Sequence, residues 1–331
     1  MDFTLTEDEQ LLKDTAHRML AAECPPSLVR AHIDDRDVAG GLWEHLAGWT
    51  ELGAGPMTDL CLFLEETGAA LAPGPFFATT VLWSPLATAI GADPAGVGTV
   101  AMAGANGAWQ VNQDPVKTFV LDADRTEQVA FVLAGPTVAV ADTGSVSLRP
   151  VETVDSSRRV FEARVPEGIV GEPVDPSVIE ELLERAWVGL SAELMGTARR
   201  LLETTIAYAK ARVQFDRPIG SFQAIQHKLA DVALGVERAW AATYYAAMAM
   251  DAAGPGGGGA DSDRRRAAHV AKAASAGAAH RAAKDAVQVH GGIRFTWEHD
   301  LHLWMRRAFA SEALFGSREW HHDRLADLLL V

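Results

Sequence analysis

The chain has 331 residues, 48% of them hydrophobic, which is enough for two or three domains with substantial cores. Its formal net charge of −15 argues against general nucleic-acid binding, because that function needs a basic surface. Cys24 and Cys61 are too few for a disulfide framework, and the scattered histidines do not indicate a metal site. The start of the chain lacks a targeting pattern and no apolar run is long enough for a membrane span, so we expect a cytoplasmic protein.

The first 95 residues are expected to form an all-α domain. Thr6 and Glu9 have the spacing of a capping box, in which each side chain bonds the other residue's backbone at a helix start. Apolar residues then recur at helical spacing, and further helical patterns cover residues 42–52, 60–72 and 76–90.

Residues 96–172 have a different composition, rich in Val and Thr and punctuated by Asp, Gly and Pro. Short apolar runs occupy residues 118–121, 129–133 and 137–140. This pattern is typical of β-strands joined by turns. We expect a small, shortened antiparallel β domain.

Residues 173–331 return to helical periodicity and predict a C-terminal four-helix bundle. The expected helices span residues 179–211, 222–252, 267–290, 301–315 and 319–329. Consecutive glycines at 256–259 predict a flexible loop. His321 and His322 are expected on a solvated helix face.

Two segments of this region could hold a ligand. Gly291 and Gly292 end an Ala-rich helix one turn after Gln288, which is the pattern of an ordinary helix cap and also of a backbone that a phosphate can approach. About 70 residues earlier, Arg212 and Phe215 join two helices. An arginine beside an exposed aromatic ring can hold a diphosphate and an adenine, although a simple capped turn has the same residues.

Together these segments resemble the acyl-CoA dehydrogenase family, whose members have the same α–β–α domain order. Four segments match in register, and the β domain matches weakly through residues 117–119 and 155–158. The segments are Phe3-x-Leu5-Thr6-Glu7-x3-Leu11, Arg212-x2-Phe215 to Phe222-Gln223, Gln288-x2-Gly291-Gly292, and Trp297-Glu298-His299-Asp300 before Arg306-Arg307-Ala308.

The resemblance implies an FAD-dependent oxidoreductase of lipid metabolism. Such enzymes introduce a Cα–Cβ double bond into an acyl-CoA thioester: a glutamate takes the Cα proton and FAD takes the hydride. Fatty acid or steroid side-chain β-oxidation is the implied pathway, and an electron-transfer flavoprotein is the implied acceptor.

The catalytic base of the family has no counterpart here. In many members it lies in a Tyr-Glu-Gly-Thr motif, and the aligned residues 314–317 put Phe315 at the Glu position. A minority carry it on an earlier helix, where Ala186 stands in this chain. The catalytic residue is therefore unknown, with Glu312 and Glu184 as weak substitutes.

The flavin-facing part of the β domain also departs from the family. Residues 103–109 retain little of the usual flavin-contacting loop, and Leu121 replaces a threonine whose hydroxyl bonds the flavin ring. In contrast, the chain keeps the residues that, in the family, hold the ADP half of a neighbouring subunit's FAD. These are Arg212, Gln214, Phe215, Gln223, Gln288, Gly291 and Gly292.

This division resembles the small, base-less subunits of actinobacterial α2β2 acyl-CoA dehydrogenases that act on steroid side chains. It implies a subunit that completes FAD binding in a catalytic partner, in a heterotetramer. Two alternatives remain open: a self-sufficient homodimer or homotetramer with a relocated base, and a CoA-thioester-binding or structural paralogue without redox chemistry. The sequence does not specify the acyl group, the partner, or whether FAD binds this chain alone.

Overall fold

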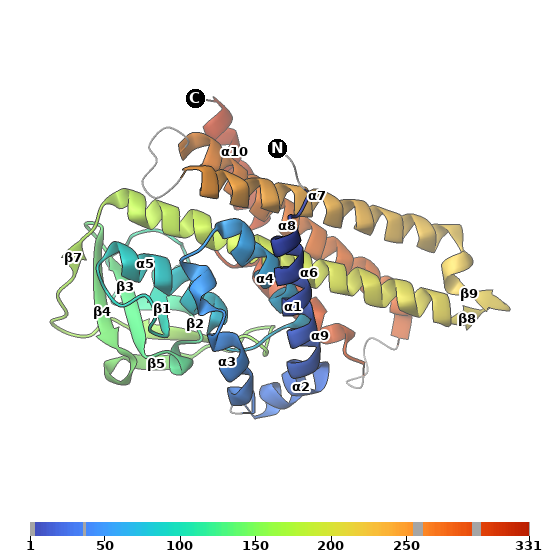
Figure 1. Ribbon diagram of the computed structural model, residues 1–331, viewed down its shortest axis with the longest axis horizontal. Coiled ribbons are helices and arrows are strands. Elements are labelled where there is room, and N and C mark those ends of the chain that lie inside the picture. Colours follow the sequence, from blue (N-terminus) through green and yellow to red (C-terminus); the bar gives the residue numbers. More distant parts are fainter. Residues whose placement is uncertain (1–3, 36–37, 254–260, 293–298, 331) are drawn as a thin grey trace.

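The computed structural model describes residues 4–35, 38–253, 261–292 and 299–330. It has a helical N-terminal region, two small sheets and a bundle of long helices (Figure 1). The expected glycine loop at 256–259 and the matched residues Phe3, Trp297 and Glu298 lie outside the described residues.

The first helix begins where the sequence predicts, whereas the helix Pro26–Asp34 has no counterpart among the expected ones. Thr6 accepts a hydrogen bond from the Glu9 backbone at 3.2 Å, and the Thr6 amide donates to the Glu9 carboxylate at 2.7 Å, which confirms the capping box. A π-helix at Ala78–Trp83 leads directly into the last helix of this region. The helices are α1 (Glu7–Glu23), α2 (Pro26–Asp34), α3 (Gly40–Ala47), α4 (Met57–Ala70) and α5 (Ser84–Ala89).

Two sheets follow, one with the order β1-β3-β4-β7 and the other with the order β2-β6-β5. One pair differs from the expected antiparallel arrangement: β1 lies parallel to β3, because the long β2 excursion into the second sheet separates them in the chain. The strands are β1 (Gly98–Ala101), β2 (Val116–Leu121), β3 (Gln128–Leu133), β4 (Thr137–Asp142), β5 (Ser147–Pro150), β6 (Val160–Arg164) and β7 (Glu172–Pro173).

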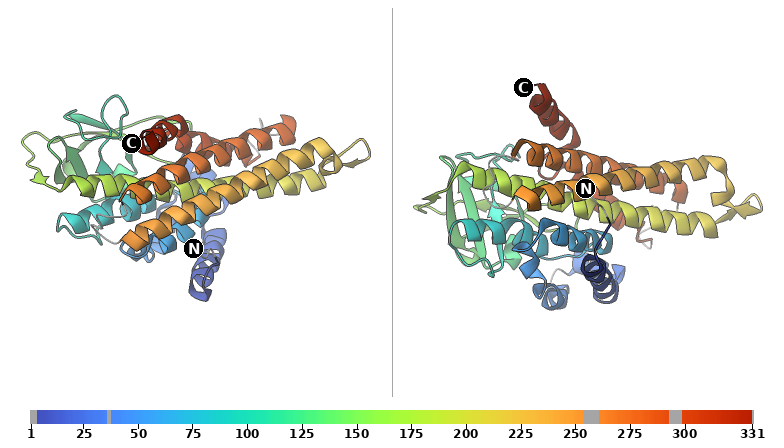
Figure 2. Two further views of the ribbon diagram at one scale, coloured as in Figure 1. Left: turned by 90° about the horizontal axis from the view of Figure 1, so that it is seen from above. Right: turned by 45° about the horizontal axis from the view of Figure 1, so that its top comes forward.

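The bundle is built around α6 (Pro176–Ala211), a helix of 36 residues. α6 starts beside the sheets and ends at the hairpin of β8 (Val213–Gln214) and β9 (Arg217–Pro218), so the sheets and the hairpin occupy opposite ends of the molecule (Figures 1 and 2). α7 (Gln223–Ala253), α8 (Asp261–His290), α9 (Leu301–Ala313) and α10 (Arg318–Leu330) complete the bundle.

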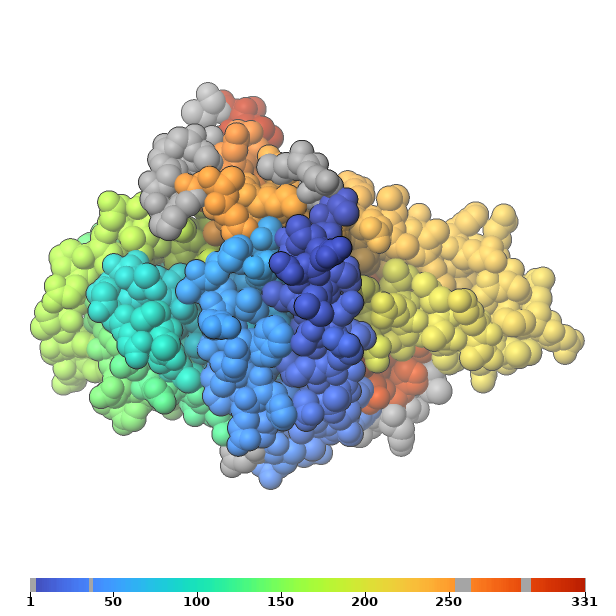
Figure 3. All heavy atoms as spheres, viewed as in Figure 1, coloured from blue at the N-terminus to red at the C-terminus, as the bar shows by residue number. Residues whose placement is uncertain are grey.

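The N-terminal helices pack closely on one face of the bundle (Figure 3). Glycine permits this contact, since a Cβ atom on Gly196 of α6 would lie 1.8 Å from the backbone oxygen of Glu65 in α4, and one on Gly68 of α4 would lie 2.1 Å from that of Glu193. None of the helices in the described ranges is long and apolar enough to cross a bilayer. The domain limits expected near residues 95 and 172 stay a prediction.

Candidate functional site

A cavity of about 650 Å³ lies between the sheet region and the segment that joins α9 to α10. Its walls come from three stretches, namely the loop before β2 with one residue of that strand, the loop before β6 with its first residue, and the end of α9 through to the start of α10. The residues lining it are Asn106, Gly107, Ala108, Trp109, Gln110, Phe119, Thr153, Val154, Asp155, Arg158, Val160, Phe309, Ala310, Ser311, Ala313, Leu314, Phe315, Gly316, Ser317 and Trp320.

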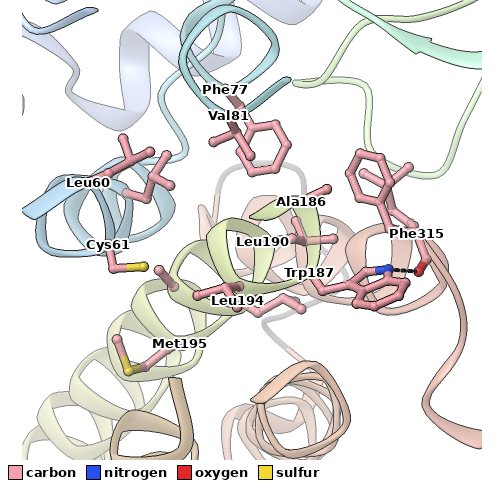
Figure 4. Close-up of a cluster of buried hydrophobic side chains, with 14 of the residues drawn as sticks. Leu60, Cys61, Phe77, Val81, Ala186, Trp187, Leu190, Leu194, Met195 and Phe315 are labelled. Carbon is pink, nitrogen blue, oxygen red and sulfur yellow. Dashed lines mark hydrogen bonds between the residues drawn. The ribbon is translucent and has the colours of Figure 1, made fainter. Parts of the chain in front are cut away.

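Phe315 lies at the inner wall of this cavity. Its backbone is left-handed, with φ of +59°, and its side chain is only 2% exposed. Its carbonyl accepts a hydrogen bond from the indole of Trp187 at 2.9 Å (Figure 4). Its ring centroid lies 4.2 Å from that of Trp109 and 6.1 Å from that of Phe77, so the ring is packed into an aromatic cluster.

The two positions that carry the base in different members of the family meet here. Ala186 and Phe315 both line a smaller, apolar pocket beneath the larger cavity, although 129 positions separate them in the sequence. Among the described residues that form it, none has a carboxylate, a hydroxyl or an imidazole. They are Leu82, Val100, Met102, Trp109, Leu182, Leu183, Ala186 and Phe315.

Glu184 does not face this pocket. Its side chain is fully buried on the opposite side of α6, where its carboxylate accepts hydrogen bonds from Arg264 at 2.6 Å and from Arg265 at 3.0 Å. Both oxygens are therefore engaged by guanidinium groups of α8, which makes Glu184 a structural anchor between the two helices.

Glu312 also points away from the cavity. Its carboxylate lies 2.8 Å from Nδ1 of His280 on α8, and Glu312 is absent from the residues that line either pocket. Neither substitute for the missing base therefore lies where the two family base positions meet.

Lys272 of α8 supports the backbone that carries Phe315. Its ammonium group donates hydrogen bonds to the carbonyls of Glu312 at 2.8 Å and Gly316 at 3.2 Å, which closes the C-terminal end of α9. Burial lowers the pKa of Lys272 to about 7, although the nearby Glu312 charge favours the protonated form. A buried amine thus holds the loop in place.

The expectation that His321 and His322 share a solvated surface is wrong for His321. His321 is fully buried, and its Nδ1 lies 2.8 Å from Nδ1 of His269, while Trp187 packs against both imidazole rings. Burial is the largest cause of the low pKa values of His269, about 4, and His321, about 2. Adjacent residues point in different directions on a helix, so His322 remains exposed while His321 enters the core.

A network of buried charges lies beside the cavity. Arg307 pairs with Asp155, and Arg158 pairs with Glu193. Asp122 is buried next to both arginines, and burial raises its pKa to about 7 despite their positive charges. The sequence offered a weak signal for residues 155–158 and none for Asp122, because its partners are distant in the chain.

The strand that aligns with the family's flavin-facing strand is irregular in shape. β2 has a bulge between Lys117 and Val120, where Phe119 adopts a left-handed conformation with φ of +54°. The Phe119 ring lies 6.0 Å from that of Trp109 and forms part of the cavity wall. Leu121, at the position of the family's threonine, is buried and contributes no polar group.

At the far end of α6, the β8–β9 hairpin exposes an aromatic ring. Arg212 caps the helix, and Phe215 lies at the hairpin tip with φ of +54° and 85% of its surface exposed. Phe222 meets Phe215 edge-on at 6.1 Å, and the Arg217 guanidinium lies 4.1 Å above the Phe222 ring. The hairpin therefore holds Phe215 away from any hydrophobic core.

The glycine pair after α8 lies at this same end of the bundle. The Tyr208 ring of α6 stacks on the His290 ring at 4.3 Å, which joins the last turns of the two helices. Gly291 follows with φ of +62°, and no atom lies within 4 Å of the position of a Cβ on Gly291 or Gly292. The backbone here is open to an approaching molecule.

Several side chains at this end are free to bind a ligand. Arg212, Gln223 and Gln288 are exposed, and within the described part of the chain none has a side-chain hydrogen bond or ion pair. Gln214 differs, because its amide donates to the Val213 carbonyl at 2.8 Å. We name Arg212, Gln214, Phe215, Gln223, Gln288, Gly291 and Gly292 the distal cluster.

Comparisons with known proteins give the family. The family model for the acyl-CoA dehydrogenase C-terminal domain matches residues 177–330. Acyl-CoA dehydrogenase IpdE2 of Mycobacterium tuberculosis is 33% identical over 326 residues, covering 95% of each chain. The chain belongs to the acyl-CoA dehydrogenase family. It is therefore placed among oxidoreductases that act on CH–CH groups.

Further relatives of this acyl-CoA dehydrogenase chain extend the comparison. Acyl-CoA dehydrogenase FadE34 of M. tuberculosis is 35% identical over 283 residues, covering 80% of this chain and 37% of that protein. The structure of the ChsE4-ChsE5 complex from M. tuberculosis superposes with a TM-score of 0.85 and 23% identity, covering 100% of this chain and 99% of that chain. A Tcur3481-Tcur3483 steroid acyl-CoA dehydrogenase variant gives a TM-score of 0.85, 24% identity and 99% coverage of both chains. These similarities confirm the expected fold.

Proposed function

We propose that this chain is a non-catalytic subunit of a heteromeric acyl-CoA dehydrogenase and that it binds the ADP half of an FAD whose flavin ring lies in a homologous partner subunit. One observation carries the proposal. Arg212, Gln223 and Gln288 of the distal cluster are exposed and have no side-chain partner among the described residues, while the two family base positions, Ala186 and Phe315, lie in an apolar pocket.

The length of α6 supports binding across a subunit interface. Ala186 and Tyr208 lie on the same unbroken helix, about 22 residues and thus roughly 33 Å apart. Tyr208 contacts His290 at the distal cluster, whereas Ala186 lines the pocket under the main cavity. A cofactor that contacted both the apolar pocket and the distal cluster of one chain would have to extend along the whole helix between them. The distal cluster is therefore better placed to bind a cofactor of a neighbouring chain.

The distal cluster has the chemistry that an adenosine diphosphate group needs. Arg212 offers a guanidinium without an internal partner, which suits bidentate pairing with phosphate oxygens. The open backbone at Gly291 and Gly292 allows close approach, and the exposed Phe215 ring offers a surface for an adenine.

The chain's own cavity has a poor fit for a flavin ring. Leu121 provides no hydroxyl, and Phe119 and Trp109 project aromatic rings into the space between the sheet and α9. Asp155 and Arg158, the charged residues of the wall, are already paired with Arg307 and Glu193. A ring rich in hydrogen-bonding atoms would find few free partners there.

In the proposed assembly, the chemistry that FAD would supply is acceptance of a hydride from Cβ of an acyl-CoA thioester. The residues of this chain would have a binding role: Arg212 would neutralise the diphosphate, and Gln223 and Gln288 would orient the adjoining groups through their amides. The partner supplies the base, and an electron-transfer flavoprotein is the acceptor. The ChsE4-ChsE5 complex and the Tcur3481-Tcur3483 steroid enzyme, both of the same fold, motivate a heterotetramer and a steroid side-chain substrate.

The two other functions have less support. A self-sufficient enzyme needs a base at the apolar pocket, and Glu184 and Glu312 are both paired with side chains of α8. In a paralogue without redox chemistry, the unpaired Arg212 beside the open glycine pair would have no FAD to bind.

The decisive experiment compares the chain alone with the chain co-expressed with a full-length homologue encoded next to it. We expect the purified chain to be colourless and the complex to contain one FAD per heterodimer, as judged by flavin absorbance and mass photometry. The proposal fails if the chain alone carries stoichiometric FAD and oxidises acyl-CoA. A complex without flavin would instead favour the structural paralogue.

A further inference from the structure

The cavity between the sheets and α9 has the size and wall of a ligand site. Its volume of about 650 Å³ falls within the rough range of 300–1,000 Å³ that small-molecule pockets occupy. Small residues leave this space open, and aromatic rings surround it. The aromatic residues of the wall are Trp109, Phe119, Phe309, Phe315 and Trp320.

The ionised side chains in the wall are already neutralised. Asp155 pairs with Arg307, and although burial opposes its ionisation, the Arg307 charge and Ser157 hold the pKa of Asp155 below its usual value. Arg158 pairs with Glu193. A charged ligand would have no counter-ion in this wall, and a charged group transferred there would lose its hydration without compensation.

Most of the remaining polar groups are also engaged within the protein. Asn106 accepts from the Ala108 amide at 3.0 Å, Thr153 donates to the Asp155 carbonyl at 2.8 Å, and Ser317 accepts from the Trp320 amide at 3.2 Å. The cavity therefore offers mainly van der Waals contact and aromatic stacking.

The backbone holds two of the aromatic rings at a cost. Phe119 and Phe315 both have left-handed φ values, +54° and +59°, a conformation that is unfavourable for a residue with a side chain. Phe315 regains stability because its ring is buried, but Phe119 remains 38% exposed. A ligand that covers Phe119 would supply the contact that this strained position lacks in the free chain.

We infer that this cavity is a binding site for an uncharged, rigid, apolar ring compound and not for a flavin ring. The inference rests on the proposed function, in which this chain does not hold a flavin ring of its own. The compound stacks against Trp109 and Phe119 and fills the cavity as far as the α9–α10 connection.

The test uses the full chain and two ring compounds. Nile red is uncharged, rigid and apolar, and lumiflavin is the isoalloxazine ring without a ribityl-phosphate chain. We expect Nile red to bind at one site per chain with a blue-shifted emission, and we expect lumiflavin neither to bind nor to displace it.

Two matched substitutions test whether the bound dye lies in the cavity. Ala313 lies on the cavity rim and Ala326 lies on the exposed part of α10, outside the cavity lining. Ala313→Trp should weaken Nile red binding at least about tenfold, or ~1.4 kcal/mol, whereas Ala326→Trp should leave it unchanged. Trp109→Ala, which removes a stacking surface, should also weaken binding.

The outcomes separate this inference from the proposed function. If neither compound binds, or if Ala313→Trp leaves dye binding unchanged, the cavity inference is wrong and the proposed function stands. If lumiflavin binds at one site and displaces Nile red, the cavity is a flavin-ring site and both ideas fail.

Discussion

The indole nitrogen of Trp187 donates a hydrogen bond of 2.9 Å to the carbonyl of Phe315. Trp187 directly follows Ala186 on α6, so this bond joins the two sequence positions that carry the family's base. It also fixes the left-handed turn at Phe315 against the helix. The bond therefore holds the two candidate base positions together, and both of them are apolar in this chain.

Restoring a glutamate at this position should therefore destabilise the chain. Phe315→Glu would remove a buried ring and place a carboxylate among apolar side chains, at a cost of about 3 kcal/mol or more. Urea unfolding measures the loss. Phe309→Glu is the control, because Phe309 is half-buried and the same change should cost less. Equal stability of Phe315→Glu and the wild type would mean that the pocket is hydrated.

Glu184→Gln tests whether this carboxylate is structural or catalytic. The substitution leaves Arg264 and Arg265 without their shared partner, and breaking a buried ion pair costs about 3–5 kcal/mol. We expect a lower unfolding midpoint, with unchanged turnover per folded complex when the partner is present. Glu180→Gln, which alters an exposed pair with Arg265, should have a small effect. Loss of turnover without loss of stability would identify Glu184 as the base.

Arg212→Ala tests the distal cluster. A charge-assisted hydrogen bond contributes about 1.5–3 kcal/mol, so the FAD content of the co-expressed complex should fall after gel filtration while the stability of the isolated chain stays the same. Arg18→Ala, an exposed change on α1, is the control. Full retention of FAD by the Arg212→Ala complex would rule out a diphosphate contact at this residue.

Lys272→Met tests the buried cation under the Phe315 loop. The pKa of Lys272 is lowered from 10.5 to about 7, so between these values the unfolded state binds more protons and the wild type gains stability as pH rises. The gain is at most about 1.4 kcal/mol per pH unit. Urea unfolding at pH 7 and 8.5 should show this slope in the wild type and a smaller one in Lys272→Met. Parallel slopes would show that the amine is already solvated in the folded state.

The long helices could be predicted because their signals are local, although α8 begins at Asp261 and not at residue 267 as expected. The Thr6–Glu9 capping box and the apolar spacing along α6 need no distant partner. The open glycine pair was also visible, since Gly291 follows directly on a helical pattern. The family resemblance predicted the distal cluster, whose role stays a prediction, and Tyr208 and His290 join its two segments in the structure.

Other features depend on contacts between distant residues. The pairing of His269 with His321 crosses from α8 to α10, and nothing around His321 in the sequence distinguishes it from His322. The bulge in β2 changes the direction in which the Phe119 ring points, compared with its direction in a regular strand. The charge network needs Asp122, Arg158 and Arg307 together, and these residues belong to different segments of the chain.

The continuity of α6 has a geometric consequence for the evolution of the proposed complex. One residue inserted into this helix would turn the β8–β9 hairpin by about 100° relative to the sheets and displace it by about 1.5 Å. A partner whose cofactor pocket matches the present spacing would then meet Phe215 on the wrong side. The number of residues in α6 is thus expected to be more tightly constrained than their identities, and insertions that other helices tolerate should abolish assembly here.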